Sequence, residues 1–239
     1  MIEPLDPMTF KKLVFFTGAG MSAESGVHTF RGAGGIWSQY HWQEYACQQA
    51  FERDPQKVLD FHELRRKEAL RCQPHAGHKV ITSLQQRHSA VFIITQNIDN
   101  LHQAAGSRNV IEFHGNASRL DCLNCGQSFG ASEFELKNKV PRCRDCSSVL
   151  KPSVIFFGEA IPMQALAESE RLSNLADAIL VIGTSAVVYP ASSIPFIVKS
   201  NGGRVIEMNL ESTGLTRSIT DVFIQGPAGT TLPELIAHL

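Results

Sequence analysis

The sequence has no excess of charge of either sign, with 22 Lys and Arg against 23 Asp and Glu over 239 residues. Proteins whose main partner is nucleic acid or an anionic membrane usually carry a basic patch, so we expect neither as the principal partner. No stretch approaches the roughly 20 apolar residues of a membrane span, and the first residues show no basic start followed by an apolar run. We expect a cytoplasmic protein, and a monomer.

Internal repeats and low-complexity tracts are also missing. The chain does have 43% hydrophobic residues, enough for one substantial core and a small appended module but not for two full-sized domains. We therefore expect one main domain with insertions.

Short apolar runs recur along the chain. Because their hydrophobicity is continuous and not alternating, each predicts a strand buried on both faces. Helical patterns lie between most of them, for example at 78–88 and 162–178, which predicts an α/β fold with a doubly wound, Rossmann-like parallel sheet. Ligands of such sheets bind beyond the carboxyl ends of the strands. The runs span residues 13–18, 90–97, 109–115, 153–159, 178–185, 204–209 and 221–227.

Two stretches break this alternation and are predicted to be insertions. Residues 38–73 are polar and helical, and Asp54 followed by Pro55 predicts a helix that starts there and runs to about Arg71. Residues 118–152 contain four cysteines and few large apolar side chains. The predicted Rossmann-like domain is then made of residues 1–37, 74–117 and 153–239.

The cysteines Cys122, Cys125, Cys143 and Cys146 follow the pattern C-x2-C-x17-C-x2-C. This spacing is typical of a structural zinc site, in which four thiolates complete a tetrahedron and leave no open position for catalysis. A pair of disulfides is the alternative, although the chain shows no secretory signal. Cys47 and Cys72 stand outside the pattern and are expected to be small buried hydrophobic residues.

The first apolar run leads into a glycine turn, G-x-G-x-x-A at residues 18–23, which predicts a helix whose N-terminus and backbone amides face a pyrophosphate. No acidic residue follows a second strand about twenty residues later, as a dehydrogenase would need for its ribose. A glycine-rich loop with one aromatic residue and one arginine follows instead, at residues 24–37.

At this point the chain resembles the sirtuins, the NAD-dependent protein-lysine deacylases, over nearly its whole length. One departure is His28, where the family more commonly has proline. The matching stretches are residues 18–37 (GAGMSAESGVHTFRGAGGIW), 95–102 (TQNIDNLH), 112–115 (EFHG), the four cysteines, 151–159 (KPSVIFFGE), 183–185 (GTS) and 207–211 (EMNLE).

The resemblance implies NAD as co-substrate, one structural zinc and acyl-lysine proteins or peptides as substrates. It places Asn97 and Asp99 with the catalytic residues, in the nicotinamide pocket. The implied contacts to NAD come from Gly18, Ala19, Gly20, Ser22, Glu24, Thr29, Phe30, Arg31, Trp37, Gln96, Asn97, Ile98, Asp99, Gly183, Thr184, Ser185, Asn209, Leu210, Glu211 and Ala228. Those to the substrate backbone, which would add a strand, come from Ile155, Phe156, Phe157, Gly158 and Glu159.

The resemblance also implies that His114 is the general base. A neutral imidazole with a pKa of about 6.5 can accept a proton from a ribose hydroxyl, a role worth roughly 10²- to 10⁴-fold in rate. In the implied reaction the acyl oxygen attacks the ribose carbon that carries nicotinamide. The acyl group then passes to the 2′-hydroxyl, and free lysine and O-acyl-ADP-ribose are released.

Acyl selectivity is predicted to depend on His62 and Arg65. Sirtuins that remove succinyl or malonyl groups carry a tyrosine and an arginine three residues apart on this helix, with room left at the position of Ala33. Here the arginine is Arg65 and the tyrosine is replaced by His62. Residues three apart share a helix face, so both could line one pocket, and protonation of His62 below about pH 6.5 would then favour succinyl groups.

Three other functions remain open from the residues alone. A protein ADP-ribosyltransferase would share the NAD site and His114. A hydride-transferring dehydrogenase would need the missing ribose-binding acid. A non-catalytic NAD sensor or a zinc-ribbon nucleic-acid module would not need His114, Asn97 and Asp99 together.

Overall fold

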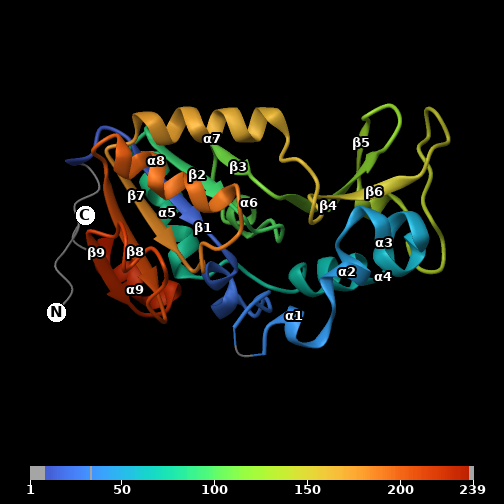
Figure 1. The fold of residues 1–239 in the computed structure, drawn as a ribbon, viewed down its shortest axis with the longest axis horizontal. Coiled ribbons are helices and arrows are strands. Elements are labelled where there is room, and N and C mark those ends of the chain that lie inside the picture. The colour runs from blue at the N-terminus through green and yellow to red at the C-terminus, as the bar shows by residue number, and fades with distance from the viewer. Residues whose placement is uncertain (1–8, 33, 237–239) are drawn as a thin grey trace.

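The computed structural model of the protein describes residues 9–32 and 34–236. Within them, parallel strands form a six-stranded sheet in the order β3-β2-β1-β7-β8-β9 (Figure 1). The sequence order reverses between β1 and β7, as in a Rossmann-like doubly wound sheet. The predicted fold class is confirmed. The strands are β1 (Leu13–Thr17), β2 (Val91–Thr95), β3 (Val110–Glu112), β7 (Ala178–Ile182), β8 (Arg204–Asn209) and β9 (Val222–Gln225).

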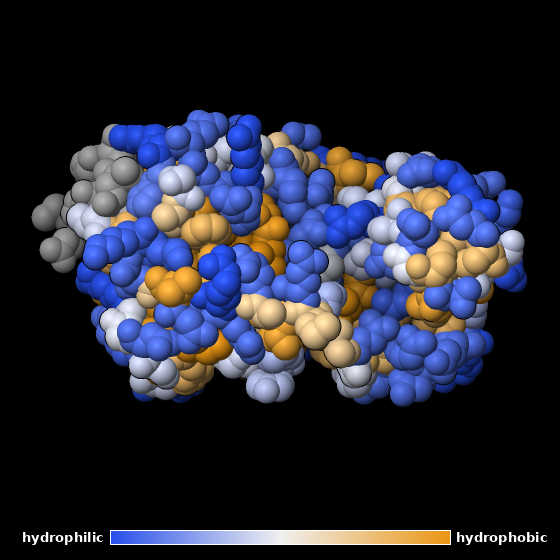
Figure 2. Space-filling view, turned by 90° about the horizontal axis from the view of Figure 1, so that it is seen from above, coloured by the Kyte–Doolittle hydropathy of each residue, from blue (hydrophilic) through white to orange (hydrophobic). Residues whose placement is uncertain are grey.

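Both faces of this sheet are covered by helices. In β1, Leu13 and Phe15 belong to one core with α5 (Ala76–Arg87) and α9 (Ala228–Ile236), which cover one face. The alternating side chains of the same strand pack on the other face against α7 (Met163–Leu175) and α8 (Ile194–Ser200). Period-two alternation between two cores explains why the strand is apolar throughout. None of the described helices has the length and apolar character that a membrane crossing requires. On the face drawn in Figure 2, hydrophilic residues predominate and apolar residues form scattered patches.

The apolar run at 153–159 was expected to add a strand to the parallel sheet, and this prediction is wrong. Strand β6 (Leu150–Val154) instead pairs antiparallel with β4 (Gly115–Cys122), which also pairs with β5 (Ser128–Gly130). The rest of the run turns away at Gly158, where φ is +87°. An apolar run predicts burial but does not say against which sheet, and Phe156 is buried in a separate core.

That separate core joins the two predicted insertions into one small lobe, drawn at the right of Figure 1. Helices α1 (Ile36–Gln39), α2 (Trp42–Tyr45), α3 (Gln48–Arg53) and α4 (Pro55–Ala69) precede the three-stranded sheet. Phe51 and Leu59 of α3 and α4 share buried contacts with Leu120 and Cys143 from the cysteine-bearing segment. The domain boundaries proposed from sequence stay a prediction, but these insertions bury their apolar residues together.

The predicted start of α4 is confirmed. The Asp54 carboxylate accepts a hydrogen bond from the backbone N–H of Lys57 at 3.0 Å, and Pro55 occupies the first helical turn, as an N-cap requires. The helix ends at Ala69, two residues before the expected end.

The chain crosses between the two lobes immediately after β3. Phe113 is fully buried, His114 follows, and β4 of the small sheet begins at Gly115. Gly115 has φ of +80°, and a Cβ there would lie 2.0 Å from the backbone oxygen of Ser153, so only glycine fits. The returning strand is tied to this crossing, because Ile155 donates its backbone N–H to the oxygen of His114 at 3.0 Å.

Candidate functional site

The turns after β1 and β7 lie in direct contact, at the point where the strand order reverses. Gly18 donates its backbone N–H to Ile182 at 2.9 Å, and Gly20 donates to Gly183 at 2.8 Å. A Cβ on Gly20 would lie 2.7 Å from Cα of Gly183, so a side chain would force the two turns apart. This is the part of an α/β sheet at which nucleotides bind.

The helix expected after the glycine turn is not formed. Two short 3-10 turns, η2 (Ala19–Met21) and η3 (Ala23–Ser25), follow β1 and end at Gly26, where φ is +95°. The backbone N–H groups of Met21 and Ser22 donate within the turn, to Gly18 and Ala19. The helix N-terminus that was expected to bind a pyrophosphate is therefore absent. A ligand would meet the shape and the side chains of the turn instead.

Polar side chains from three strand ends meet above this turn. Gln96 follows β2 and donates from Nε2 to Oγ1 of Thr184 at 3.0 Å. The side-chain amide of Asn209, at the end of β8, donates to the Thr184 backbone oxygen at 3.2 Å. Asn97 is buried and donates to the Gly18 backbone oxygen at 3.0 Å and to Oγ of Ser22 at 3.1 Å. Amide and hydroxyl groups of this kind suit an amide ring substituent and sugar hydroxyls, so the donor set fits NAD.

A buried hydrogen-bond chain, which the sequence analysis missed, supports Asn97 from behind. Thr17 donates its hydroxyl to Oγ1 of Thr95 at 2.9 Å, and the same Thr95 oxygen accepts the backbone N–H of Asn97 at 3.1 Å. Nε2 of His102 lies 3.0 Å from the Thr17 hydroxyl, whose proton is already used. His102 must therefore donate from Nε2. Burial lowers the pKa of His102 to about 4, so it is neutral at physiological pH.

A cavity opens between this crevice and helix α4. Burial raises the pKa of Asp99, against hydrogen bonds from Ser22 and the Leu101 backbone that lower it. Glu68 of this wall was not foreseen, since nothing in the sequence links it to the strand ends. The lining residues are Ala19, Val27, His28, Phe30, Ile36, Arg65, Glu68, Ala69, Asn97, Ile98, Asp99 and Ala117.

The glycine-rich loop closes one side of the cavity. The backbone N–H groups of Ile36 and Trp37 donate to the oxygens of Thr29 and Phe30 at 2.9 and 3.1 Å. The ring of Phe30 stacks on Trp37 with centroids 5.5 Å apart, and Trp37 stacks in turn on Phe61 of α4 at 6.0 Å. The loop is thus fastened to the small lobe, with the Arg31 side chain exposed. Ala33 lies outside the described residues.

The predicted adenosine-side residues lie further along the sheet edge. Glu24 accepts a hydrogen bond from the backbone N–H of Gly229, in the first turn of α9, which begins at the buried Ala228. This contact links the turn after β1 to the last helix of the chain. Ser185, Leu210 and Glu211 are exposed at the rim.

His114 stands at the junction of the lobes, half-buried. Its Nδ1 lies 3.3 Å from the backbone oxygen of Gln96. Burial is the main cause that lowers the pKa of His114 below 6.5; the bond to Gln96 opposes it, and the Arg31 charge adds to it. The imidazole is therefore neutral at pH 7 and able to accept a proton.

In the segment predicted to bind the substrate backbone, residues 155–159, several backbone N–H groups already donate hydrogen bonds within the protein. Phe157 donates to the backbone oxygen of Ala46 at 2.8 Å, and Phe156 donates to the Glu159 carboxylate at 2.8 Å. Phe156 is 2% exposed, because its side chain packs into the core of the small lobe. Ile155 and Phe157 are half-buried and Gly158 is exposed.

The structure separates His62 from Arg65. Arg65 lines the cavity, but His62 is 6% exposed, stacks on Phe156 and lies with Nε2 3.1 Å from the backbone oxygen of Tyr45. Burial lowers the pKa of His62 to about 4, so the protonation expected near pH 6.5 does not occur there. A shared helix face predicted a shared pocket, but Tyr45 and Phe156 cover the His62 end of that face.

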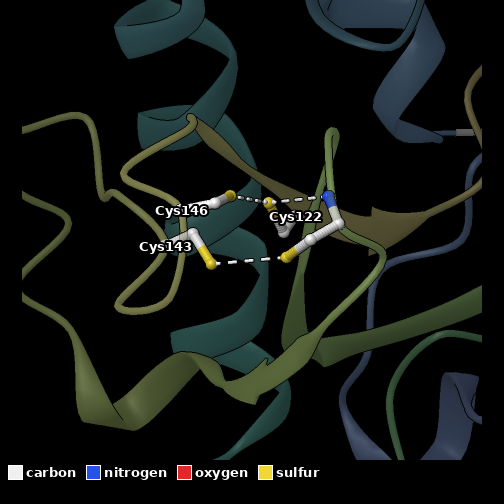
Figure 3. Close-up of side chains that lie close together, drawn as sticks. Cys122, Cys143 and Cys146 are labelled. Carbon is white, nitrogen blue, oxygen red and sulfur yellow. Dashed lines mark hydrogen bonds between the residues drawn. The ribbon is translucent and has the colours of Figure 1, made fainter.

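The four cysteine Sγ atoms converge, each within 4.8 Å of the others (Figure 3). Sγ of Cys122 lies 3.4 Å from that of Cys146, and Sγ of Cys125 lies 3.6 Å from that of Cys143. Thiolates about 2.3 Å from a tetrahedral zinc are about 3.8 Å apart, so the cluster fits one structural zinc. All six cysteines are free thiols, which argues against the two disulfides.

Comparison with known proteins gives one consistent relationship. The sequence profile of the Sir2 family matches residues 18–190. A curated relative from Thermococcus kodakarensis, named NAD-dependent protein deacylase, is 46% identical over 232 residues, covering 95% of this chain and 90% of the relative.

Two solved structures are similar throughout. One is a mutant Sir2 homologue in complex with 2′-O-acetyl-ADP-ribose, 41% identical with a TM-score of 0.90, over 98% of this chain and 96% of that one. The other is Sir2 with a p53 peptide and NAD+, 32% identical with a TM-score of 0.84, over 96% of this chain and 93% of that one.

Proposed function

The chain belongs to the Sir2 family, and we propose that it is an NAD-dependent deacylase that removes acyl groups from protein lysine side chains in the cleft between its lobes. The observation that carries this proposal is the place of His114. Its imidazole stands where the NAD-type crevice at the strand ends meets the small lobe, and its neutral form is favoured by burial.

NAD, when bound, supplies an ADP-ribosyl carbon for the acyl oxygen and nicotinamide as leaving group. Arg31, Gln96, Thr184 and Asn209 would hold its phosphate and ribose groups. Asn97 and Asp99 would hold the nicotinamide amide in the cavity, where the carboxyl oxygens of Asp99 can accept hydrogen bonds from the amide NH2 group. Phe30, clamped by Trp37, covers that side.

His114 moves the proton. The Gln96 backbone oxygen can only accept, so Nδ1 carries the hydrogen and Nε2 keeps its lone pair. Nε2 then accepts a ribose hydroxyl proton, which is the general-base role expected to contribute roughly 10²- to 10⁴-fold. A zinc ion held by the four cysteines would stabilise the small lobe and take no part in this step.

The peptide would lie between the lobes and pair with the backbone groups of residues 155–159 that have no partner among the described residues, beside the exposed Gly158. Main-chain pairing gives affinity without demanding one sequence. Arg65 would face the far end of the acyl chain in the cavity, so we propose that succinyl and malonyl groups are accepted beside acetyl. We also propose a cytoplasmic location, because cysteines without disulfide partners suit a reducing compartment.

Incubation with NAD and a panel of acetyl-, succinyl- and malonyl-lysine peptides tests the proposal. Release of nicotinamide with loss of the acyl mass, followed by mass spectrometry, is the expected result. Nicotinamide release with an ADP-ribosyl group added to the peptide would show a transferase instead. No nicotinamide release from any zinc-loaded sample would refute both.

A further inference from the structure

Two successive arginines on α4 are partnered differently. Arg66 donates from Nε and Nη2 to the carboxylate of Glu63, at 2.6 and 2.9 Å. Arg65 pairs from Nη1 with Oε2 of Glu68 at 3.0 Å, and its Nε is buried without an acceptor among the described residues. The edge formed by Nε and Nη2 is the one that grips a carboxylate side-on. On Arg66 this edge is occupied by the Glu63 carboxylate, whereas on Arg65 the Nε–H of the same edge has no acceptor in the described part of the chain.

Arg65, which carries the unpaired Nε–H, is one of the residues that line the cavity. Arg65 and Glu68 form one wall, and Asn97 and Asp99 belong to the same lining. The guanidinium is also held from outside the cavity, with Cζ 5.7 Å from the ring centres of Tyr40 and Phe61. An unpaired buried donor favours a ligand with an acceptor at that point. Aromatic contacts and Glu68 together keep the guanidinium from turning away.

Glu68 has two opposing effects on such a ligand. Its carboxylate fixes the guanidinium through Nη1, which orders the Nε edge. It also places a negative charge a few ångströms from any anion that reaches this edge, and like charges at that distance repel even when partly screened. A neutral acyl chain benefits from the order and does not feel the repulsion.

We propose that Glu68 is a specificity-determining residue of the acyl pocket: it partly neutralises Arg65, so that the pocket takes acidic acyl chains without rejecting neutral ones. This inference rests on the proposed deacylase function. Glu68 acts on the acyl group only through Arg65 and the local charge.

The test is the ratio of kcat/KM for a succinyl-lysine peptide to that for the matched acetyl-lysine peptide. Glu68→Gln keeps a hydrogen-bond acceptor for Nη1 and removes the charge. It should raise the ratio at least about tenfold, the effect of removing one partly screened like charge. Glu63→Gln is the matched control, because it alters the neighbouring ion pair outside the cavity lining, and it should leave the ratio within about twofold.

A double-mutant cycle completes the test. In an Arg65→Met background, Glu68→Gln should raise the ratio by a clearly smaller factor, since only the direct repulsion of the acyl carboxylate, and no longer the neutralisation of a guanidinium, is removed. A ratio unchanged by Glu68→Gln, or an increase that is equally large without Arg65, overturns the proposal.

A binding measurement separates this inference from the proposed function. Calorimetry with the two peptides needs no turnover, and Glu68→Gln should tighten succinyl-peptide binding selectively by a similar factor. Selective tightening without nicotinamide release would leave the role of Glu68 intact and refute the deacylase. If the enzyme turns over but Glu68→Gln changes neither the ratio nor the binding, the deacylase function stands and the role of Glu68 is refuted.

Discussion

Nδ1 of His114 lies 3.3 Å from the backbone oxygen of Gln96, the residue whose own side chain donates to Thr184. One residue therefore fixes the tautomer of the base and lines the crevice from which the proton arrives. The arrangement resembles the way enzymes generally orient an imidazole through its second nitrogen.

Replacing the base should abolish turnover without unfolding the protein. His114→Ala or His114→Tyr removes Nε2 and should lower kcat by roughly 10²- to 10⁴-fold, because the half-buried ring serves proton transfer more than packing. Circular dichroism and NAD binding would verify that the variants are folded. His41→Ala, an exposed histidine of the small lobe, is the control. More than about a tenth of the wild-type rate in His114→Ala would contradict the assignment.

Activity should hold steady from pH 8 to about 6.5 and fall only at lower pH. Burial disfavours the imidazolium, so the pKa of His114 is lowered and the neutral base persists below the ordinary titration range. A profile of kcat/KM against pH would show an acid limb below that value. An acid limb centred above pH 7 would mean that another group titrates.

The free energy of unfolding should decrease as the pH is lowered, because of a different histidine, His62. The pKa of His62 is about 4 in the folded protein against 6.5 for a free side chain, so the unfolded chain binds the extra proton between these values. Stability is thus complete above pH 6.5 and declines below it, by about 1.4 kcal/mol per pH unit for this residue.

Urea unfolding at pH 7.5 and 5.5 would measure the decline. His62→Gln keeps a donor for the Tyr45 oxygen and should reduce the pH dependence by one proton. The remaining slope is expected from His102 and His78, because burial lowers their pKa values to about 4 and about 2. An unchanged slope in His62→Gln would show that His62 is protonated in the folded state.

A methyl group on Gly20 should impair the NAD site. The added Cβ would lie 2.7 Å from Cα of Gly183, and neither backbone can move aside cheaply. We expect Gly20→Ala to raise KM for NAD at least about tenfold, with a stability loss of roughly 1–3 kcal/mol typical of overpacking. Gly214→Ala, where a Cβ meets nothing within 4 Å, is the control. Unaltered NAD kinetics in Gly20→Ala would mean that the two turns can separate.

Loss of the metal should unfold the small lobe before the main sheet. Cys122 and Cys143 belong to the same buried core as Phe51 and Leu59 of α3 and α4. Chelation or Cys143→Ala should therefore remove hydrogen-exchange protection from these helices while β1 keeps its own, with activity lost in parallel. Cys72→Ala should retain about one zinc per chain. Active, freshly purified protein with much less zinc would contradict the structural role.

Local patterns predicted most of the fold because their physics is local. The cysteine spacing, the cap at Asp54 and the apolar strands each follow from neighbouring residues. The predictions that were wrong concerned residues whose surroundings are set by contacts with residues far away in the sequence. Nothing near Phe156 in the sequence says that it packs on α3, and nothing near His62 says that Tyr45 and Phe156 cover it.

The candidate site divides in the same way. Strand-end residues such as Asn97 and Asn209 were expected together, because parallel strands end at one edge. The contact of Glu24 with Gly229 joins residues far apart in the chain, and the glycine turn lacks its expected helix because its amides close on themselves. Spacing alone carries no signal for either.

The bond from Ile155 to the oxygen of His114 joins the main domain to the small lobe, so we expect any relative motion of the two to pivot there. Outgoing and returning chains are tied at one place, and Gly115 lets them touch. A swing of the small lobe about this point would widen or narrow the cleft while the base stays near the axis. His114 would then keep its tautomer and its orientation while substrate enters and product leaves. NMR exchange broadening should accordingly be weaker at Ile155 than at β5, the outer strand of the small lobe.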